Sequence, residues 1–212
     1  MMLAIISDIH GNLPALEKAL NLIKKVKVDN YLFLGDVVGY GPWSNECVEL
    51  ISTLKNSFKI KGNHEDYYLK KKFNGKNRLT KKFFKESFYN FKRFDLIKEY
   101  KEEIIIDDIE FKHTIENKYI FSDTEINLKK NLVLGHSHQQ FFKNIKQFWV
   151  LNPGSLGQNR KNINLMQYAI LDTKTSYYKF FTEKHDIGAV IKKMVERKYP
   201  DDCIEYYRSR TR

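Results

Sequence analysis

Apolar residues fill three short stretches near the start of this chain, at 2–7, 31–35 and 57–60. Runs of this length predict short buried strands. The segments between them carry the residue spacing of amphipathic helices, so the order is strand, helix, strand, helix, strand. That order predicts a parallel sheet with right-handed crossover connections.

The two intervening helices are indicated by their ends and by their apolar positions. Asn12 is placed to cap the first helix, with Pro14 in its first turn. The second helix is predicted from Glu46 to Leu54. The inward face of the first helix is predicted from apolar residues at spacings of three and four, namely Leu13, Leu16, Leu20 and Ile23.

From about residue 101 the pattern changes to short strands with few helices between them. This change predicts a second, more antiparallel sheet. A final helix is expected from about Asp186 to Arg197, followed by a charged tail. The strands are expected at 102–106, 109–113, 132–134, 140–145, 147–151, 167–171 and 177–182.

The segment 67–100 does not follow either rhythm. Its aromatic residues recur at helical spacing (Phe84, Phe88, Phe91), which predicts two helices joined near Asn74-Gly75. We interpret the segment as a helical insert or cap within a single domain that spans 1–212. Aromatic residues that cover the core are the favoured explanation of its aromatics. A basic cap beside a site for a phosphorylated ligand stays open as the explanation of its lysines.

The composition supports a folded, soluble protein. The chain has 212 residues, of which 42% are hydrophobic and 14% aromatic, enough for a substantial core. Its two cysteines, Cys47 and Cys203, have no metal-binding spacing and suit a reducing compartment. The N-terminus lacks the basic region of a signal peptide, and no apolar stretch approaches the ~20 residues that span a bilayer. We therefore expect a cytoplasmic protein with no membrane partner.

The formal net charge of +11 has two explanations. A basic surface attracts phosphate-bearing ligands and nucleic acid. The chain is also rich in Lys, Asn, Ile, Phe and Tyr together, which is typical of a genome-wide bias in composition. Since acidic residues are interspersed over most of the chain, the bias is favoured, and nucleic acid is the less favoured partner. The sequence gives no indication of the oligomeric state.

Polar residues collect where the predicted strands end. In open α/β sheets, ligands bind beyond the carboxyl ends of the strands, so these side chains are expected to converge. Two carboxylates, an amide oxygen and several imidazoles suit a pair of divalent metals, whereas thiolate-seeking metals are disfavoured because no cysteine is near. The clusters contain Asp8 and His10, then Asp36, then Asn63 and His64, then His113, and finally His136 and His138.

These motifs, in this order, resemble the calcineurin-like metallophosphoesterase superfamily. The stretches "DIHGNLPALE", "GDVVGYGP", "NPGSLGQNR" and "YAILD" are similar to its small prokaryotic YfcE-like members. The resemblance covers most of 1–66 and 130–172, roughly half of the chain. It implies an α/β fold in which two mixed β-sheets are sandwiched between helices in four layers.

The resemblance also implies a binuclear metal centre that hydrolyses a phosphoester by attack of a metal-bridging hydroxide. We expect Mn as the most suitable metal, with Fe, Zn, Co or Ni as alternatives, and a small or nucleotide-like phosphodiester as the substrate. His64 is implied as the acid that protonates the leaving oxygen. One metal would be held by Asp8, His10, Asp36 and His138, and Asp36 would bridge to the second metal, completed by Asn63, His113 and His136.

Substrate contacts are expected from Asn12, Tyr40 and Arg160, the last of which follows the "NPGS" turn. Two alternatives stay open: a non-catalytic scaffold of the same fold, and a nuclease that uses the basic segment 67–100. His185 lies outside every motif and is interpreted as a solvated residue.

The chain departs from the family pattern at two points. Thr114 follows His113 where the family commonly has a glycine, which makes His113 the least certain ligand. Gly39 stands where related phosphatases carry the aspartate that orients the acid. Glu65 or Asp66 is the candidate to orient the His64 ring instead.

Overall fold

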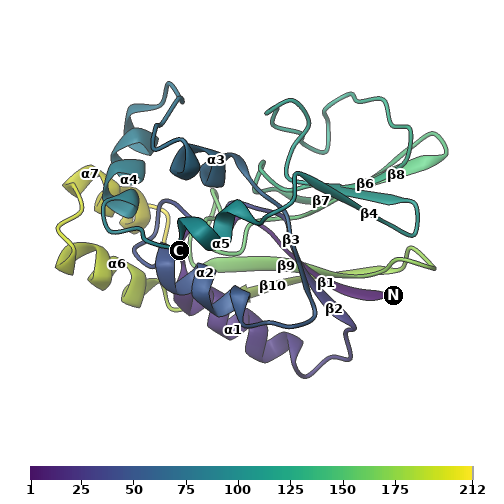
Figure 1. The fold of residues 1–212 in the computed structure, drawn as a ribbon, viewed down its shortest axis with the longest axis horizontal. Helices are drawn as coiled ribbons and strands as arrows, with labels where there is room; N and C mark the ends of the chain where they lie inside the picture. Colours follow the sequence, from purple (N-terminus) through teal and green to yellow (C-terminus); the bar gives the residue numbers. More distant parts are fainter. Residues whose placement is uncertain (212) are drawn as a thin grey trace.

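Two five-stranded sheets and seven helices make up the computed structural model, which describes residues 1–211 (Figure 1). The strands are β1 (Met2–Ile6), β2 (Asn30–Phe33), β3 (Ser57–Lys59), β4 (Glu103–Ile106), β5 (Ile109–Lys112), β6 (Asn131–Val133), β7 (Gln140–Ile145), β8 (Phe148–Pro153), β9 (Leu165–Asp172) and β10 (Tyr178–Lys184). The helices are α1 (Leu13–Ile23), α2 (Ser44–Ser52), α3 (Asn63–Leu69), α4 (Arg78–Phe88), α5 (Phe94–Lys98), α6 (Ile187–Glu196) and α7 (Asp201–Arg208).

The first sheet has the order β10-β9-β1-β2-β3. Strands β1, β2 and β3 are parallel, as predicted from the strand and helix order. Strands β9 and β10 were expected in the second sheet, and that expectation is wrong. β9 pairs antiparallel with β1, with Ile5 opposite Ala169, and β10 pairs with β9. Both faces of β9 are buried, Tyr168 on one side and Ala169 on the other, because it lies inside the sheet.

The second sheet has the order β4-β5-β6-β8-β7. Its three central strands, β5, β6 and β8, run parallel to one another, and its two edge strands are antiparallel to their neighbours. Both sheets are therefore mixed, which confirms that part of the predicted fold class.

Alternate residues of the strands separate three apolar layers. Leu3 and Ile5 of β1 face Val133 and Leu151 of the second sheet, in a core between the two sheets. Ile6 of β1 belongs to the opposite face of the first sheet, which packs against α1 and α2. This period of two gives β1 one face for the other sheet and one face for the helices, so the two sheets pack face to face.

The outer face of the second sheet is covered by the segment 114–130 and not by a helix. Ile115, Ile126 and Leu128 of this segment pack against Leu132 and Leu134. The predicted fourth, helical layer is thus formed here by irregular chain, because the residues between β5 and β6 make no helix.

The segment 67–100 contains the end of α3, then α4 and α5. The predicted break near Asn74-Gly75 falls in the loop between α3 and α4, and a third short helix follows. Phe84 and Phe91 are buried in the core cluster against the first sheet, and Phe88 packs on it. The aromatics of the insert therefore cover the core, as favoured from the sequence.

The C-terminal part differs from the sequence expectation in two ways. The charged tail contains a helix, α7, whose Ile204 and Tyr207 pack with Phe83 of α4 and with α6. His185 is also buried, with only 7% of its surface exposed, so its interpretation as a solvated residue is wrong. Its Nε2 lies 2.9 Å from the carbonyl of Ile163.

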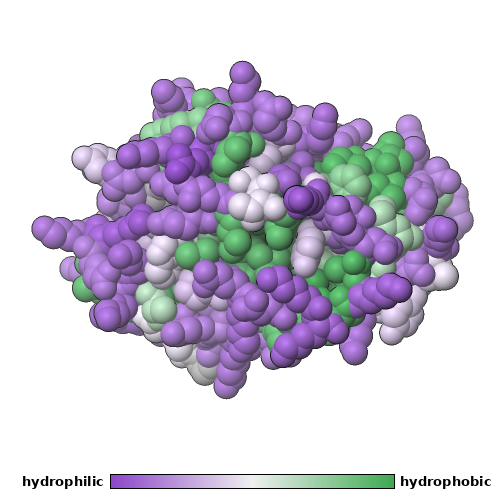
Figure 2. Space-filling view, turned by 60° about the horizontal axis from the view of Figure 1, so that its bottom comes forward, coloured by the Kyte–Doolittle hydropathy of each residue, from purple (hydrophilic) through white to green (hydrophobic). Residues whose placement is uncertain are grey.

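The surface is mostly hydrophilic on the face shown in Figure 2, where apolar residues gather around the centre. Within residues 1–211, none of the helices combines the length and the apolar character that a bilayer crossing requires.

At the start of α1 the predicted cap is confirmed, since the side chain of Asn12 accepts a hydrogen bond from the amide of Ala15 and Pro14 lies in the first turn.

Candidate metal centre

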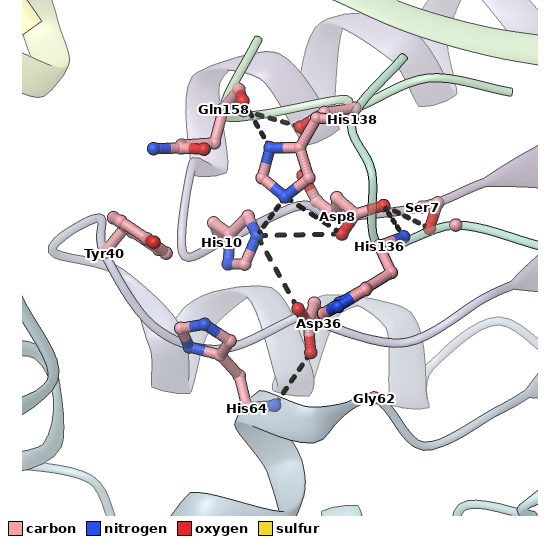
Figure 3. A network of polar contacts seen from close by, with 12 residues as sticks. Ser7, Asp8, His10, Asp36, Tyr40, Gly62, His64, His136, His138 and Gln158 are labelled. Atoms are coloured by element: carbon pink, nitrogen blue, oxygen red, sulfur yellow. Dashed lines mark hydrogen bonds and ion pairs between the residues drawn. The ribbon is translucent and has the colours of Figure 1, made fainter. Parts of the chain in front are cut away.

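Polar side chains from the turns that follow β1, β2, β3 and β6 point toward one another (Figure 3), and His113 after β5 lies beside them. β1, β2 and β3 of the first sheet lead into the turns that carry the first clusters, and β5 and β6 of the second sheet lead into the others. The His10 and His138 Nε2 atoms, which come from different sheets, lie 3.1 Å apart. All of the histidine and aspartate candidates are buried: Asp8, His10, Asp36, His64, His113, His136 and His138.

Five of these residues have a left-handed backbone that residues with a side chain rarely adopt. The φ angles are 54° at Asp8, 49° at His10, 52° at Asp36, 67° at His136 and 58° at His138. Such a conformation costs of order 1–3 kcal/mol for each residue and persists only where the surrounding structure holds it. The cost is concentrated in the turns that aim these side chains at one another, which is typical of a functional site.

Three imidazoles present the same nitrogen to the centre. The Nδ1 atoms of His10, His113 and His138 lie 3.3, 2.6 and 2.6 Å from the carbonyl oxygens of Val38, Leu34 and Gln158, respectively. A carbonyl only accepts, so each Nδ1 donates its proton, and a ring of this orientation keeps a lone pair on Nε2 whenever it is neutral. Metal-ligating histidines are commonly oriented by such a bond at the other ring nitrogen.

Two buried carboxylates complete the centre. Asp8 Oδ2 accepts hydrogen bonds from Ser7 Oγ at 2.6 Å and from the amide of His136 at 3.0 Å. Its Oδ1 lies 3.2 Å from His138 Nε2. Because protein donors hold Oδ2, Oδ1 is the oxygen that faces the imidazoles.

The two carboxylate oxygens of Asp36 also have different partners. Its Oδ1 accepts a hydrogen bond from the amide of His64 at 2.8 Å. Its Oδ2 lies 3.3 Å from His113 Nε2 and 3.8 Å from His10 Nε2. A Cβ at Gly62 would overlap the Asp36 carboxylate, so glycine is required for this approach. Asp36 therefore lies between the two groups of imidazoles.

The electrostatics of the centre favour a cation. Burial opposes ionisation of Asp8 and Asp36, yet neighbouring imidazoles, chiefly His138 for Asp8 and His113 for Asp36, hold both pKa values well below the ordinary range. Burial opposes protonation of His113, but the Asp36 carboxylate raises its pKa to about 10. In contrast, burial lowers the pKa of His10 and, to about 4, that of His136. Two ionised carboxylates thus attract positive charge into a cluster of mostly neutral rings.

The residues fit divalent metal ions. Ligand atoms lie within 4.8 Å of one another in a first group of Asp8, His10 and His138, in a second of Asp36, His113 and His136, and in a third, which shares members with both, of His10, Asp36 and His64. Asn63 Oδ1 lies 3.2 Å from His113 Nε2, beside the second group. The buried His136 Nε2 has no hydrogen-bond partner, which is costly unless a ligand satisfies it. Nitrogen and oxygen donors without thiolate suit metals such as Mn, Fe or Zn.

Glu65 has a structural position that sequence reasoning missed. Its carboxylate accepts hydrogen bonds from the amides of Asp36, Val37, Val38 and Gly62 at 2.8–3.1 Å. It thereby holds the turn after β2 against the start of α3. Burial and the nearby Asp36 raise its pKa to about 7. The sequence feature that could have indicated this role is the position of Glu65 directly after Asn63 and His64.

Neither Glu65 nor Asp66 orients the His64 ring, which corrects that expectation. Glu65 is engaged by backbone amides, and Asp66 pairs with Lys61 at 3.1 Å. The His64 Nδ1 is buried without a hydrogen-bond partner. It packs against Gly39, where any Cβ would overlap the ring. The left-handed glycine (φ 94°) therefore provides the space that His64 fills.

A cavity of about 150 Å³ opens over the candidate metal ligands. Tyr40 and Arg160, two of the residues expected to contact the substrate, line it. The Tyr40 ring lies 4.7 Å from that of His10, and its hydroxyl lies 3.3 Å from Thr80 Oγ1. Tyr119, for which the sequence carried no signal, stacks on His136 at 4.2 Å and lies under the Arg160 guanidinium.

Asn12 does not belong to this cavity. Its side chain is buried, caps α1 through Oδ1, and donates through Nδ2 to the carbonyl of Gly157 at 3.0 Å. Both ends of the amide are engaged within the fold, so the expected substrate contact of Asn12 is corrected to a structural role.

Comparison with known proteins identifies the family. The sequence profile of the calcineurin-like phosphoesterase superfamily domain matches residues 1–176. The chain belongs to this superfamily. A protein of Methanocaldococcus jannaschii, MJ0912, is 33% identical, with 94% of each chain covered.

Solved structures share the fold. A metallophosphoesterase from Sphaerobacter thermophilus has a TM-score of 0.79 at 22% identity, with 98% of each chain covered. The phosphoesterase YfcE from E. coli has a TM-score of 0.51 at 19% identity, over 88% of this chain and all of that one. The resemblance drawn from the sequence motifs is therefore confirmed. As a member of this superfamily, the protein is a metal-dependent phosphoester hydrolase.

Proposed function

We propose that the protein holds two divalent metal ions and hydrolyses a small phosphodiester. The observation that carries this proposal is the shared orientation of His10, His113 and His138. Each ring commits Nδ1 to a backbone carbonyl and turns Nε2 toward a buried carboxylate. When the rings of His10 and His138 are both neutral, their Nε2 lone pairs lie 3.1 Å apart and repel each other unless a cation lies near both.

The proposed metal ligands correspond to the first and second groups of ligand atoms described above. Asp8, His10 and His138 would hold one ion, His113, His136 and Asn63 the other, and Asp36 would be shared. When bound, a pair of such ions activates a water as the nucleophile and stabilises the charge that develops on the phosphoryl oxygens. We propose Mn²⁺ as the preferred metal, because nitrogen and oxygen donors are present without thiolate.

His64 is the proposed source of the proton for the leaving oxygen. No acceptor faces its Nδ1, so a proton there would be buried without a partner. The neutral ring therefore carries its proton on Nε2. His64 also lines the cavity, within reach of a group held there. When the leaving group is an alkoxide, such general-acid assistance typically accelerates the reaction by roughly 10²–10⁴-fold.

We propose that the insert supplies part of the substrate site. Phe73, Lys76, Asn77 and Thr80 line the cavity opposite the candidate ligands. Arg160 is exposed at its rim, where a guanidinium is able to hold a phosphate oxygen with two N–H groups. The cavity is smaller than the roughly 300–1,000 Å³ of typical sites for larger ligands. Its size favours a substrate whose phosphate alone enters it.

A nuclease is the second candidate, supported by a groove on the insert. Eleven lysines and arginines against three acidic residues occupy 67–100. Basic side chains and aromatic rings that alternate along a groove are typical of surfaces that bind single-stranded nucleic acid. Phe73 lines both this groove and the candidate active site. The basic groove is lined by Lys71, Lys72, Arg78, Lys81, Lys82 and Lys85, with Phe73, Phe84, Phe88 and Tyr89.

A non-catalytic scaffold is less favoured, because every expected type of metal ligand is present and the ligands converge.

Cys47 and Cys203 are free and buried, which supports a reducing, cytoplasmic location.

The test is a substrate screen after metal removal. The protein is stripped with a chelator, supplied with single metals, and assayed on phosphomonoesters, phosphodiesters and nucleotides. We expect Mn²⁺ to restore hydrolysis of diesters in preference to monoesters. Undiminished turnover without detectable metal would exclude the proposed function.

A further inference from the structure

A second chamber adjoins the candidate active site. Its volume is about 260 Å³, and its walls come from the insert, from the loops at 119 and 158–160, and from α7. Tyr40, Asn77, Thr80, Tyr119 and Arg160 line both this chamber and the cavity over the metal ligands. A molecule whose phosphate lies at the metal centre is therefore able to extend into the chamber without crossing the protein.

Four aromatic rings enclose much of the chamber: Tyr40, Phe83, Tyr119 and Tyr206. The Tyr40 and Phe83 rings lie 4.9 Å apart, and Tyr206 lies 5.7 Å from Phe83. Arg160 covers the Tyr119 ring at 4.9 Å and also lines the chamber. Aromatic faces with a nearby guanidinium favour a flat, aromatic ligand over an aliphatic one.

Gln158 adds a polar group with an unmet hydrogen bond. Only 1% of its surface is exposed, and its side chain lines the chamber beside Tyr40 (Figure 3). Its Nε2 donates to the hydroxyl of Tyr206 at 2.9 Å, whereas its Oε1 is buried with no partner. Turning the amide over would only exchange which of its two polar atoms is unpaired. A ligand edge that carries both N–H and C=O groups satisfies the amide in either orientation.

Gln158 also links the chamber to the metal ligands. Its backbone carbonyl accepts the Nδ1 proton of His138 at 2.6 Å, while its side chain lines the chamber. One residue thus orients a candidate ligand and presents a free polar atom to the neighbouring space.

We propose that this chamber binds the heteroaromatic base of a nucleoside phosphoester, with the phosphate at the metal centre and Arg160 at the junction. A nucleobase has the flat aromatic faces and the mixed N–H and C=O edge that the chamber matches. The inference rests on the proposed function, since it names the substrate class of the same site. Tyr40 and Tyr206 are then specificity residues, and Gln158 reads the base edge.

The first test compares two chromogenic diesters with the same leaving group. Thymidine 5′-(p-nitrophenyl) phosphate and methyl p-nitrophenyl phosphate differ only in the nucleoside. With metal restored, we expect kcat/KM to favour the thymidine ester by about tenfold or more, the magnitude of one stacked base. Gln158→Met, which keeps the length of the side chain, and Tyr206→Ala should each reduce this ratio severalfold.

The matched control is Gln147→Met, at an exposed turn position between β7 and β8. It should leave the ratio at the wild-type value. Because each ratio is measured within one protein, a partly unfolded variant lowers both rates and leaves the ratio interpretable.

The second test measures binding without catalysis. Ligand-observed NMR with thymidine and metal-free protein should show saturation of the base protons that is lost in Gln158→Met and kept in Gln147→Met. Equal kcat/KM for the two esters together with no thymidine binding would overturn the proposed nucleobase site but not the proposed hydrolase activity. A protein that binds thymidine through Gln158 but hydrolyses neither ester with any metal would support the chamber and overturn the proposed function.

Discussion

His10 and His138 stand 128 residues apart in the chain and follow strands of different sheets, yet their Nε2 atoms face each other at 3.1 Å. Each ring donates Nδ1–H to a backbone carbonyl, so neither neutral ring carries a proton on the facing nitrogen. When both rings are neutral, two lone pairs therefore face each other, with the Asp8 and Asp36 carboxylates alongside. A bound cation turns this unfavourable arrangement into a favourable one.

Metal binding should accordingly stabilise the protein. At a free Mn²⁺ concentration one hundred times the Kd, a site that exists only in the folded state adds about 2.7 kcal/mol. For a chain of this length, that gain raises Tm by roughly 5–11 °C. Calorimetric scans of chelated and Mn²⁺-loaded protein measure the shift.

Asp36→Ala tests whether this stabilisation comes from the candidate metal centre, because the Asp36 carboxylate lies between the two groups of candidate ligands. It should lose most of the stabilisation by Mn²⁺, bind less metal by elemental analysis and have no measurable activity. Asp123→Ala, at an exposed position in the same chain, serves as the control. If Asp36→Ala retained two metals per chain, the proposed bridge would be misassigned.

Glu65 should contribute to stability more than any exposed acid. Its carboxylate accepts hydrogen bonds from four backbone amides in a fully buried position. Glu65→Ala leaves these donors unsatisfied, and we expect a loss of more than about 3 kcal/mol in the free energy of unfolding. The neighbouring Asp66→Ala should cost less than about 1 kcal/mol, because its ion pairs lie near the surface. Urea denaturation of the metal-free proteins compares the two, and similar losses would contradict the bracing role.

The local features of the site were predictable because each candidate ligand lies in the turn that follows a strand. A short apolar run that ends in a polar turn can be recognised in sequence, and the parallel order of β1 to β3 follows from the intervening helices. Even His113, which lacks the usual following glycine, is predicted correctly as part of the cluster, since β5 ends at Lys112 and the chain leaves the sheet there.

The remainder depends on contacts between distant segments. The alternation of β9 predicts a strand, but it does not indicate that the partner of Ala169 is Ile5 in the first sheet. Likewise, His185 has no motif around it, and only the folded chain shows that it is buried with its amide and its Nε2 against the carbonyls of Asn164 and Ile163, which precede β9. Asn12 was assigned two roles from sequence, and only the folded chain shows that the cap and Gly157 occupy both ends of its amide.

His185 should make the stability of the protein depend on pH. Burial lowers the pKa of its imidazole from the ordinary value of 6.5, so the folded state keeps the ring neutral. In the unfolded chain the ring takes up a proton as pH falls below about 6.5. Its contribution to stability is therefore complete above that pH and is lost progressively as the pH decreases.

The comparison is between the wild type and His185→Gln, which keeps a donor for the carbonyl of Ile163. Urea denaturation of metal-free protein at about pH 7.5 and pH 5 should show a smaller loss of stability in the variant. All other titratable groups are the same in the two proteins, so the difference isolates His185. Parallel pH profiles would contradict its burial as a neutral ring.

Salt dependence separates the two proposed functions. Hydrolysis of a small diester should change little between about 50 and 200 mM salt. The double variant Lys81→Ala/Lys85→Ala should not alter it. These lysines line the basic groove and do not line the candidate active site. Faster cleavage of a single-stranded oligonucleotide, with a steep loss of rate in salt that the double variant reduces, would instead favour the nuclease.

His64 should affect alkyl esters far more than aryl esters. Its proposed task is to protonate the leaving oxygen, and a nitrophenolate leaves readily without a proton. His64→Asn keeps an N–H group in the cavity but removes the titratable ring. We expect it to retain its metals, to cleave p-nitrophenyl esters at a moderately reduced rate, and to lose about 10²–10⁴-fold on alkyl or nucleoside esters.

Gly39→Ala provides an independent check on the position of the ring. The new Cβ would overlap His64 Nδ1, and the left-handed backbone at this position disfavours any side chain. If His64 acts as the acid, displacement of its ring should reproduce the selective loss on alkyl esters while the metal content stays unchanged. The measurement is kcat for a matched aryl and alkyl pair in both variants, with elemental analysis of each protein. Equal losses on the two esters with both metals in place would leave His64 with only a structural role in the loop.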